Sequence, residues 1–257
     1  MKSLNSFAPL VLGSLLALAT AQAALIVHYD FENNVNDQSG APLNNGTLLG
    51  GAAYIADSPF GSGSSLSTNA GAENQGVNVA GDPSLGSSTF TLAYWIKPTT
   101  NQESGASTNG LERLTSRAGD SFETAVGDAS AVGGTTSPTG VTLSYYQGGW
   151  NVTNVPITIG DWSHVAWVNT AGGMEVFLNG VSAFTGPAVA APRPGADFMN
   201  IGTRHNSVEG FEGYMDDFRL YDTALSAGEV AALAVPEPSG AILAVLGLAG
   251  LTLRRRR

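Results

Sequence analysis

The stretch GYMDDFRLY, residues 213–221, combines aromatic, aliphatic and acidic residues in a pattern that fits a β-strand. Side chains of a strand alternate between its two faces, so we expect Asp216, Phe218 and Leu220 to share one face. A carboxylate among core side chains is costly unless it is hydrogen-bonded or bound to a cation. The stretch therefore predicts a buried strand that carries a polar group in need of a partner.

Eight further segments have the composition of short strands: 26–32, 76–79, 89–97, 114–116, 142–146, 161–169, 174–178 and 197–201. Glycine is frequent and charged residues are scarce, which is typical of short strands joined by turn-rich loops. No alternation of strands with helices is visible. This pattern predicts an all-β, antiparallel two-sheet sandwich or jelly roll.

Local signals mark one hairpin and one helix. Asn179-Gly180 follows a strand and tolerates the left-handed conformations of a tight hairpin turn. Ser226 and Glu229 have the spacing of a capping box ahead of a short apolar helix, which must end before Pro236. Between residues 101 and 140 the pattern weakens, and we expect long surface loops with one or two short strands.

The N-terminal segment, residues 1–23, has the parts of a secretory signal peptide. Lys2 precedes an apolar core, and Ala21-Gln22-Ala23 forms a small-x-small cleavage site. We expect cleavage between Ala23 and Ala24. The chain contains no cysteine, so export brings no disulfide framework.

The C-terminal segment, residues 235–257, combines Pro236-Glu237-Pro238, the apolar run 241–253 and a closing cluster of arginines. The two prolines keep the triplet extended and accessible to a peptidase. A helix over the apolar run would be roughly 20 Å long, against about 30 Å of hydrocarbon in a bilayer. This hydrophobic helix predicts a transient membrane anchor, although a buried core helix with a basic end is the alternative.

The order of these parts resembles the bacterial PEP-CTERM sorting signal. The resemblance implies that secretion machinery exports the chain and that an exosortase-type membrane peptidase processes it. It also implies a Gram-negative-type bacterium, passage through the inner membrane, and delivery to the cell surface or the extracellular matrix. Residues 24–234 then form the delivered domain.

The charge of the predicted domain excludes some partners. Between residues 24 and 234, six basic residues stand against twenty acidic ones, which gives a net charge of −14. Nucleic acids and anionic membranes would not be attracted to such a surface. The composition suits a secreted protein, or one that collects divalent cations.

Several motifs of the later half resemble one family. They are DWSHVA at 161–166, VFLNG at 176–180, NIG at 200–202, FEGYMDDFRLY at 211–221 and ALS at 224–226. Their order and spacing resemble a LamG-like domain of the concanavalin A-like lectin/glucanase superfamily, and YDFEN at 29–33 and DQSG at 37–40 agree more loosely. The resemblance implies a concanavalin A-like jelly roll with the end helix over one edge of a sheet.

Two interpretations of Asp216 remain open. It could accept hydrogen bonds from the backbone, Trp162 or His164 as a structural latch. Alternatively it could ligate Ca²⁺ together with Asp37 and loop carbonyls from residues 33–40, because Ca²⁺ takes six to eight oxygen ligands. The resemblance allows this cofactor, since members of the superfamily often carry such an ion.

Catalytic patterns are weak in this chain. Glucanases of the superfamily that use a Glu-x-Asp-x-Glu strand align two carboxylates on one face, and the chain has no such spacing. None of the three histidines, His28, His164 and His205, accompanies a Gly-x-Ser-x-Gly elbow. The sequence therefore predicts no enzyme activity, and a secreted carbohydrate-active hydrolase or lyase with an unrecognised site is the alternative.

Aromatic residues provide the binding candidates. In 90–97 both faces carry apolar groups, which favours a covered strand with Trp95 in a core. Trp150 follows a Gly-rich turn, and with Tyr146 it could stack on a sugar or simply close one end of the core. The predicted function is an exported, non-catalytic surface or matrix module that binds a polysaccharide or a matrix protein.

Overall fold

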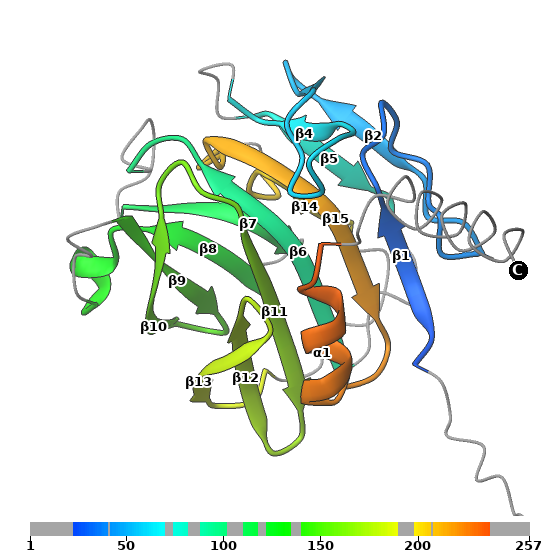
Figure 1. The fold of residues 1–257 in the computed structure, drawn as a ribbon. Helices are drawn as coiled ribbons and strands as arrows, with labels where there is room; N and C mark the ends of the chain where they lie inside the picture. The colour runs from blue at the N-terminus through cyan, green and yellow to red at the C-terminus, as the bar shows by residue number, and fades with distance from the viewer. Residues whose placement is uncertain are drawn as a thin grey trace, which may run out of the picture.

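The computed structural model describes residues 23–40, 42–69, 74–81, 88–101, 110–117, 122–134, 140–189, 198–206 and 208–236. Two antiparallel β-sheets pack face to face in a sandwich, and one short α-helix lies outside it (Figure 1). The predicted fold class, an all-β antiparallel two-sheet sandwich, is confirmed.

Sheet A has eight strands among the described residues. In spatial order they are β13 (Val181–Gly186), β12 (Gly173–Leu178), β11 (Ser163–Thr170), β6 (Phe90–Pro98), β15 (Gly213–Tyr221), β4 (Ser65–Ser67) and β3 (Ala53–Ile55), with β1 (Leu25–Tyr29) also paired to β15. The longest strands, β6 and β15, therefore lie next to each other in the centre.

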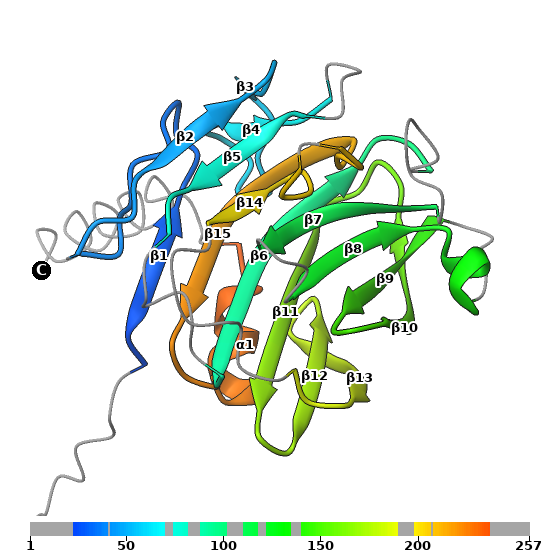
Figure 2. The same cartoon turned by 180° about the vertical axis from the view of Figure 1, so that it is seen from behind.

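Sheet B has seven strands in the part of the chain that is described. Their order is β10 (Trp150–Thr158), β9 (Gly140–Tyr146), β8 (Glu123–Gly127), β7 (Leu111–Arg117), β14 (Met199–Ile201), β5 (Gly76–Val79) and β2 (Gly46–Leu49). A 3₁₀ turn, η3 (Ala129–Val132), follows β8. Sheet B faces the viewer in Figure 2.

The main core lies between the sheets. On β6, Leu92, Tyr94 and Ile96 point into it, and Leu143 of β9 and Ile201 of β14 meet them from sheet B. The other face of β6 is covered as well, since Trp95 is only 5% exposed. The prediction of a strand covered on both faces is confirmed.

The alternation expected for 213–221 is wrong at its centre. Met215 and Phe218 both belong to the main core, and the pairing of β15 with β6 shifts register between Asp216 and Arg219. This β-bulge puts an extra residue into β15. As a result Asp216 does not share a face with Phe218, because it lies opposite Trp95 on the outer face of sheet A.

Helix α1 (Ala227–Leu233) covers the outer face of sheet A. Its capping box is present in full: the Ser226 hydroxyl accepts from the Glu229 backbone, and the Glu229 carboxylate accepts from the Ser226 backbone. Val230 packs with Ala166 of β11 and Phe177 of β12. The helix thus lies on the side of sheet A that ends in the edge strand β13, as the resemblance implied, and also reaches β11; it is in front of sheet A in Figure 1 and behind it in Figure 2.

The strand predictions match the structure best where alternation is strong. The bounds of β5 and β15 are those predicted, and Asn179-Gly180 forms the two-residue turn between β12 and β13. No residue bounds were predicted for six strands: β2, β3, β4, β8, β10 and β13. Two strands, β7 and β8, interrupt the region 101–140, as expected.

Most of the two predicted processing segments lies outside the described residues. Only Ala23 of the signal peptide, and Val235 and Pro236 of the tail, are described. The predicted hydrophobic run 241–253 is not among them. In the described part of the chain, no helix is both long and apolar enough to cross a membrane.

Candidate functional site

A row of polar and aromatic side chains crosses the outer face of sheet B. Direct cross-strand pairs connect its members from strand to strand. The members, from β2 to β10, are Thr47, Asn78, Asn200, Ser116, Glu123, Tyr146 and Trp150, and we call this set the sheet B row. Directly opposite residues share a face, and six strand spacings of about 4.8 Å make the row roughly 29 Å long.

The aromatic end of the row is partly exposed. The rings of Tyr146 and Trp150 meet edge to face, with centroids 5.4 Å apart and planes at 66°. The guanidinium of Arg113 lies over the Trp150 ring, 4.5 Å from its centroid. Arg113 thus fixes the indole from one side, as expected for a cation–π contact. The two predicted stacking residues therefore form one unit on the outer face of sheet B.

A buried ionic cluster supports this aromatic pair. Arg113 Nε lies 2.7 Å from Glu123, and Arg113 Nη2 lies 2.7 Å from Glu209. Arg204 contacts the same two carboxylates at 3.3 and 3.2 Å. Only 2% of the Arg113 side chain and 1% of the Glu123 side chain are exposed. Two guanidinium groups therefore form ion pairs with two carboxylates, one of which, Glu123, belongs to the row.

The polar part of the row is tied into a hydrogen-bond chain. Asn78 Nδ2 donates to Asn200 Oδ1 at 2.8 Å, and Asn200 Nδ2 donates to the Arg204 carbonyl at 3.0 Å. The Ser116 hydroxyl donates to Glu123 at 2.8 Å and accepts from the backbone N–H of His205 at 3.1 Å. Side chains held in this way are preorganised donors and acceptors.

The arrangement suits recognition better than acid–base chemistry. Glu123, in the row, and Glu209, beside it, are a carboxylate pair, and each forms ion pairs with both arginines. A retaining or inverting glycosidase needs one carboxyl group to give up a proton and the other to attack or activate water. Carboxylates engaged by two guanidinium groups are poorly suited to either role.

Asp37 closes the loop between β1 and β2. Its Oδ1 accepts from the backbone N–H groups of His28 and Ser39, at 3.0 and 2.9 Å, and its Oδ2 accepts from that of Asn44 at 2.8 Å. Burial alone would raise the pKa of Asp37, but these backbone hydrogen bonds outweigh burial and hold the pKa below its usual value. Asp37 is a loop latch in the structure.

Asp216 is held at a different place, under the loop 57–63. The Ser58 hydroxyl donates to its Oδ2 at 2.8 Å, and the Asp217 backbone donates to its Oδ1 at 2.8 Å. Neither Trp162 nor His164 is its donor, since the Trp162 indole N–H donates to Asp57. Burial raises the pKa of Asp216 to about 7. The latch interpretation holds: one donor is a backbone N–H, as expected, and the other is Ser58 in place of Trp162 or His164.

Trp95 separates Asp216 from His164 on the outer face of sheet A, because it pairs with both residues across neighbouring strands. The Trp95 and His164 rings meet edge to face at 5.4 Å. His164 is 1% exposed, and burial lowers its pKa to about 4. His164 therefore has the packing role that the resemblance implied.

These contacts do not support the proposed calcium ligands. Asp37 and Asp216 bind different loops, and Asp37 already accepts three backbone N–H groups. Within the described ranges, no group of three or more His, Asp and Glu side chains is arranged to hold a metal ion. Binding of Ca²⁺ through these residues stays a prediction.

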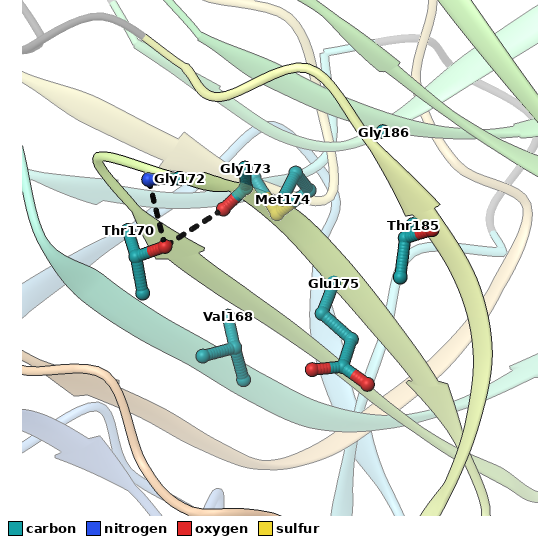
Figure 3. Close-up of a pocket in the computed structure, with 8 residues that line it drawn as sticks. All are labelled: Val168, Thr170, Gly172, Gly173, Met174, Glu175, Thr185 and Gly186. Carbon is teal, nitrogen blue, oxygen red and sulfur yellow. Dashed lines mark hydrogen bonds between the residues drawn. The ribbon is translucent and has the colours of Figure 1, made fainter.

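An open pocket of about 480 Å³ lies on sheet A near the turn between β11 and β12 (Figure 3). Thr170 shapes it, because its hydroxyl accepts from the Gly172 N–H at 3.1 Å and donates to the Gly173 carbonyl at 3.3 Å. Glu175 is the one charged side chain among its described lining residues. With no aromatic ring and no convergent polar set, this pocket is a weaker candidate than the sheet B row.

Several residues of the row and of its ionic cluster were not predicted from the sequence. Glu123 and Arg113 lie in the region 101–140, where no strand alternation was visible, and Asn200 was known only as part of a motif. Their common feature is a cross-strand register, which the sequence of one strand does not contain. A signal was available only for the aromatic end, through the Gly-rich turn before Trp150.

Comparisons with known proteins agree with the fold. The family model Laminin_G_3, described as the concanavalin A-like lectin/glucanases superfamily, matches residues 70–231. A search of curated proteins finds no match. Among solved structures, domain 4 of AbnA, a GH43 extracellular arabinanase from Geobacillus stearothermophilus in complex with arabinotriose, is similar with 22% identity and a TM-score of 0.62. That match covers 83% of this chain and 99% of the other.

Two toxin domains have the same fold. The binding domain of Paraclostridial Mosquitocidal Protein 1 has 18% identity and a TM-score of 0.62, over 82% of this chain and 52% of that chain. The binding domain of Botulinum Neurotoxin DC, in complex with SialylT, has 14% identity and a TM-score of 0.56, over 82% and 50%. The chain thus spans about half the length of these toxin structures.

Proposed function

The chain belongs to the concanavalin A-like lectin/glucanase superfamily, and from this premise we propose that it is a non-catalytic carbohydrate-binding module. The sheet B row is the binding face in this proposal. Sugars present hydroxyl groups at their edges and C–H groups on their faces, so they need fixed polar groups together with an aromatic surface. The row offers both on one face.

One observation carries the proposal: the row is continuous from Asn78 to Trp150 across strands that are distant in sequence. Six of its seven members have polar atoms besides any aromatic ring, and Trp150 contributes the largest ring. Only the two ends are exposed or half-buried, Thr47 and Asn78 at one and Tyr146 and Trp150 at the other, since Asn200, Ser116 and Glu123 are buried. We place the first sugar contact at Tyr146 and Trp150.

The non-catalytic part of the proposal rests on the ionic cluster. Arg113 and Arg204 occupy both carboxylates that lie nearest to the aromatic end. The domain of the arabinanase was solved with arabinotriose, which supports a search among neutral oligosaccharides. The alternative is a secreted hydrolase or lyase, for which Glu123 and Glu209 would be the candidate carboxylates.

The proposed site of action is outside the cell. The predicted signal peptide 1–23 and the PEP-CTERM-like tail 235–257 support export, passage across the inner membrane and processing by an exosortase-type peptidase. Contact with a polysaccharide or a matrix protein at the cell surface would follow. A cleavage assay in a host that has the peptidase, with Pro236 and Pro238 replaced by alanine, tests this part.

A glycan array with the purified protein tests the binding function. We expect binding to neutral polysaccharides, and Trp150→Ala should weaken it about tenfold because an aromatic contact is worth about 0.5–1.5 kcal/mol beyond its area. Tyr214→Ala is the matched control, since it removes a half-buried aromatic ring from sheet A. Equal loss in both variants would place the binding face elsewhere.

Product analysis separates binding from hydrolysis. Polysaccharides bound on the array are incubated with the protein, and reducing ends are measured. Chain cleavage that disappears in Glu123→Gln, while the fold is kept, would establish the enzyme alternative. No cleavage by a protein that binds the same polysaccharide supports the module.

A further inference from the structure

A second pocket lies on the opposite side of the molecule from the sheet B row. It has a volume of about 470 Å³ and is formed by β1, β15, the loop 57–63 and the C-terminal end of α1. Its polar lining includes His28, Asp217 and Arg219, and its apolar lining includes Phe60 and Leu233. None of these residues belongs to the row.

The bulge in β15 creates the polar floor. Asp217 has a φ of +46°, a left-handed conformation that is uncommon for residues other than glycine, asparagine and aspartate. Its Oδ1 accepts from Arg219 Nε at 2.9 Å and is 2.8 Å from His28 Nε2. Both hydrogen bonds use the same oxygen, so Oδ2 remains available to a group in the pocket.

The described polar lining contains more carboxylates than guanidinium groups. Burial would raise the pKa of Asp217, but the hydrogen bond from His28 and the charge of Arg219 outweigh it and hold the pKa below its usual value. Asp217 is therefore ionised at neutral pH. Asp30 adds a second carboxylate to the lining, against the single guanidinium of Arg219.

The remaining wall is aliphatic and aromatic. Leu233, the last residue of α1, and Val235, which follows the helix, line the same cavity as Phe60. The Phe60 ring packs edge to face on Trp95, with centroids 6.1 Å apart. Asp57 of the same loop binds Lys97 at 2.7 Å and Trp162 at 2.9 Å. These contacts hold the loop in position, so the wall exists before any ligand arrives.

We propose that this pocket binds a primary ammonium group at the end of a short aliphatic chain, as in the side chain of a lysine. The ammonium group has three donors and no acceptor, which complements Asp217 Oδ2 and the Asp30 carboxylate. Its aliphatic chain packs against Phe60 and Leu233. An amino sugar carries the same ammonium group but would press hydroxyl groups onto this apolar wall, which is unfavourable.

Titration of the full-length protein with n-hexylammonium, followed by NMR or calorimetry, tests the proposal. Hexanol and hexanoate have the same length, with a neutral and an anionic head group. We expect saturable binding of hexylammonium and at least tenfold weaker binding of both controls, because a hydrogen bond to a charged group is worth about 1.5–3 kcal/mol. Nα-acetyl-lysine amide should bind and glucosamine should not.

Variants identify the site. Asp217→Asn keeps the shape and suits a left-handed φ, and it should weaken hexylammonium binding about tenfold or more. Asp161→Asn removes one charge from an exposed turn and is the matched control. Ala232→Phe, at an exposed position of the lining, should fill the pocket and abolish binding. Trp150→Ala should leave hexylammonium binding unchanged, which separates this site from the glycan site.

Three results would overturn the proposal: equal binding of hexanol, stronger binding of hexanoate, or wild-type affinity in both Asp217→Asn and Ala232→Phe. If Asp217→Asn does not fold, Asp30→Asn and Ala232→Phe decide the question in its place. Binding of glucosamine as strong as that of the lysine derivative would assign the pocket to amino sugars instead.

Discussion

Arg113 connects the packing of sheet B with its candidate binding face. Its guanidinium is buried, touches Glu123 and Glu209, and lies over Trp150. Replacing one member of a buried ionic group leaves an uncompensated charge, which costs about 3–5 kcal/mol. We expect Arg113→Gln to lower the free energy of unfolding by that amount and to weaken glycan binding as well.

Arg204 is the matched control for this prediction. It contacts the same two carboxylates, but 24% of its side chain is exposed, so solvent screens its charge. We expect Arg204→Gln to cost about 1 kcal/mol or less. Urea unfolding of both variants measures the difference. Equal costs would mean that Arg113 has no special role in the cluster.

Asp216 and His164 should give the protein two opposed pH dependences. The pKa of Asp216 rises from 3.8 to about 7 on folding, so its contribution to stability is full below pH 4 and is lost as the pH rises through 7. The pKa of His164 falls from 6.5 to about 4, so its contribution is full above pH 6.5 and is lost as the pH falls through 4. Each shift corresponds to a few kcal/mol, at about 1.4 kcal/mol per pKa unit.

Single variants should separate these contributions. Between pH 4 and 6.5 the wild-type stability should change little, because the two residues act in opposite directions. Asp216→Asn should become less stable as the pH falls in this range, and His164→Gln should become more stable. Urea unfolding at half-unit steps of pH, with Asp161→Asn as the control, measures the slopes. Parallel profiles for all four proteins would contradict the prediction.

At the residue scale, the sequence predicted which residues are buried or paired better than it predicted their faces and their partners. Asp216 was expected to be buried and to accept from the backbone, and it does, yet its face and its side-chain donor were wrong because the bulge depends on pairing with β6. Trp150 and Tyr146 were expected to work together, and they touch. Arg113 was missed because its partners come from β8 and from the segment after β14.

At the scale of elements, the hairpin between β12 and β13 is fitted to helix α1. Gly180 in its turn has a φ of +78°, and a Cβ atom there would lie 3.0 Å from the Ala231 Cα and 3.1 Å from the Ala234 Cβ. Gly148 has a similar φ of +65° with open space around it. An alanine at either position must adopt a left-handed conformation, which destabilises the folded protein by about 1 kcal/mol.

The two glycines therefore provide a matched pair. We expect Gly180→Ala to cost at least about 1 kcal/mol more than Gly148→Ala, because only the former pushes against the helix. Thermal or urea unfolding of the two variants measures the difference. If both substitutions cost the same, helix α1 can move away from the added methyl group at no cost in stability. The hairpin would then not determine the position of the helix.

Strand prediction succeeded where apolar residues are regular and failed at four edge strands and at the interior strands β4 and β8. The central strands β6 and β15 and the short β5 were found because their apolar residues are regular. The edge strand β13 is largely exposed, and β10, at the edge of sheet B, contains Pro156. Edge strands tolerate proline and need no apolar alternation, so their sequences contain little signal. The helix was found through its capping box, which is a local signal.

At the scale of the whole molecule, the two outer faces have different structures. The outer face of sheet A is covered by α1 and by the loop 57–63, which bury Ala166, Trp95 and Asp216. The outer face of sheet B carries the row and its ionic cluster instead. The proposed glycan site and the proposed ammonium pocket therefore belong to opposite sides, and a single copy of the protein could hold both ligands.

Chelation tests the predicted calcium ion for the protein as a whole. A ligand that binds only the folded state raises its stability, so removal of a structural ion by EDTA would lower the melting temperature. Because Asp37 and Asp216 are occupied by hydrogen bonds at separate loops, we expect no change on addition of EDTA. A lower melting temperature that added Ca²⁺ restores would establish the ion and would require other ligands.

The net charge of the molecule predicts which glycans bind. A domain with a charge of −14 repels polyanions, and the ionic cluster of the row contains as many carboxylates as guanidinium groups. We expect a neutral polysaccharide to bind with an affinity that changes less than about twofold between 20 and 200 mM salt, because few ions are released or screened. Alginate should bind only weakly, and better at high salt, where repulsion is screened. Affinity electrophoresis at the two salt concentrations measures both, and tight binding of alginate that salt weakens would show that a basic surface, not the row, recognises the glycan.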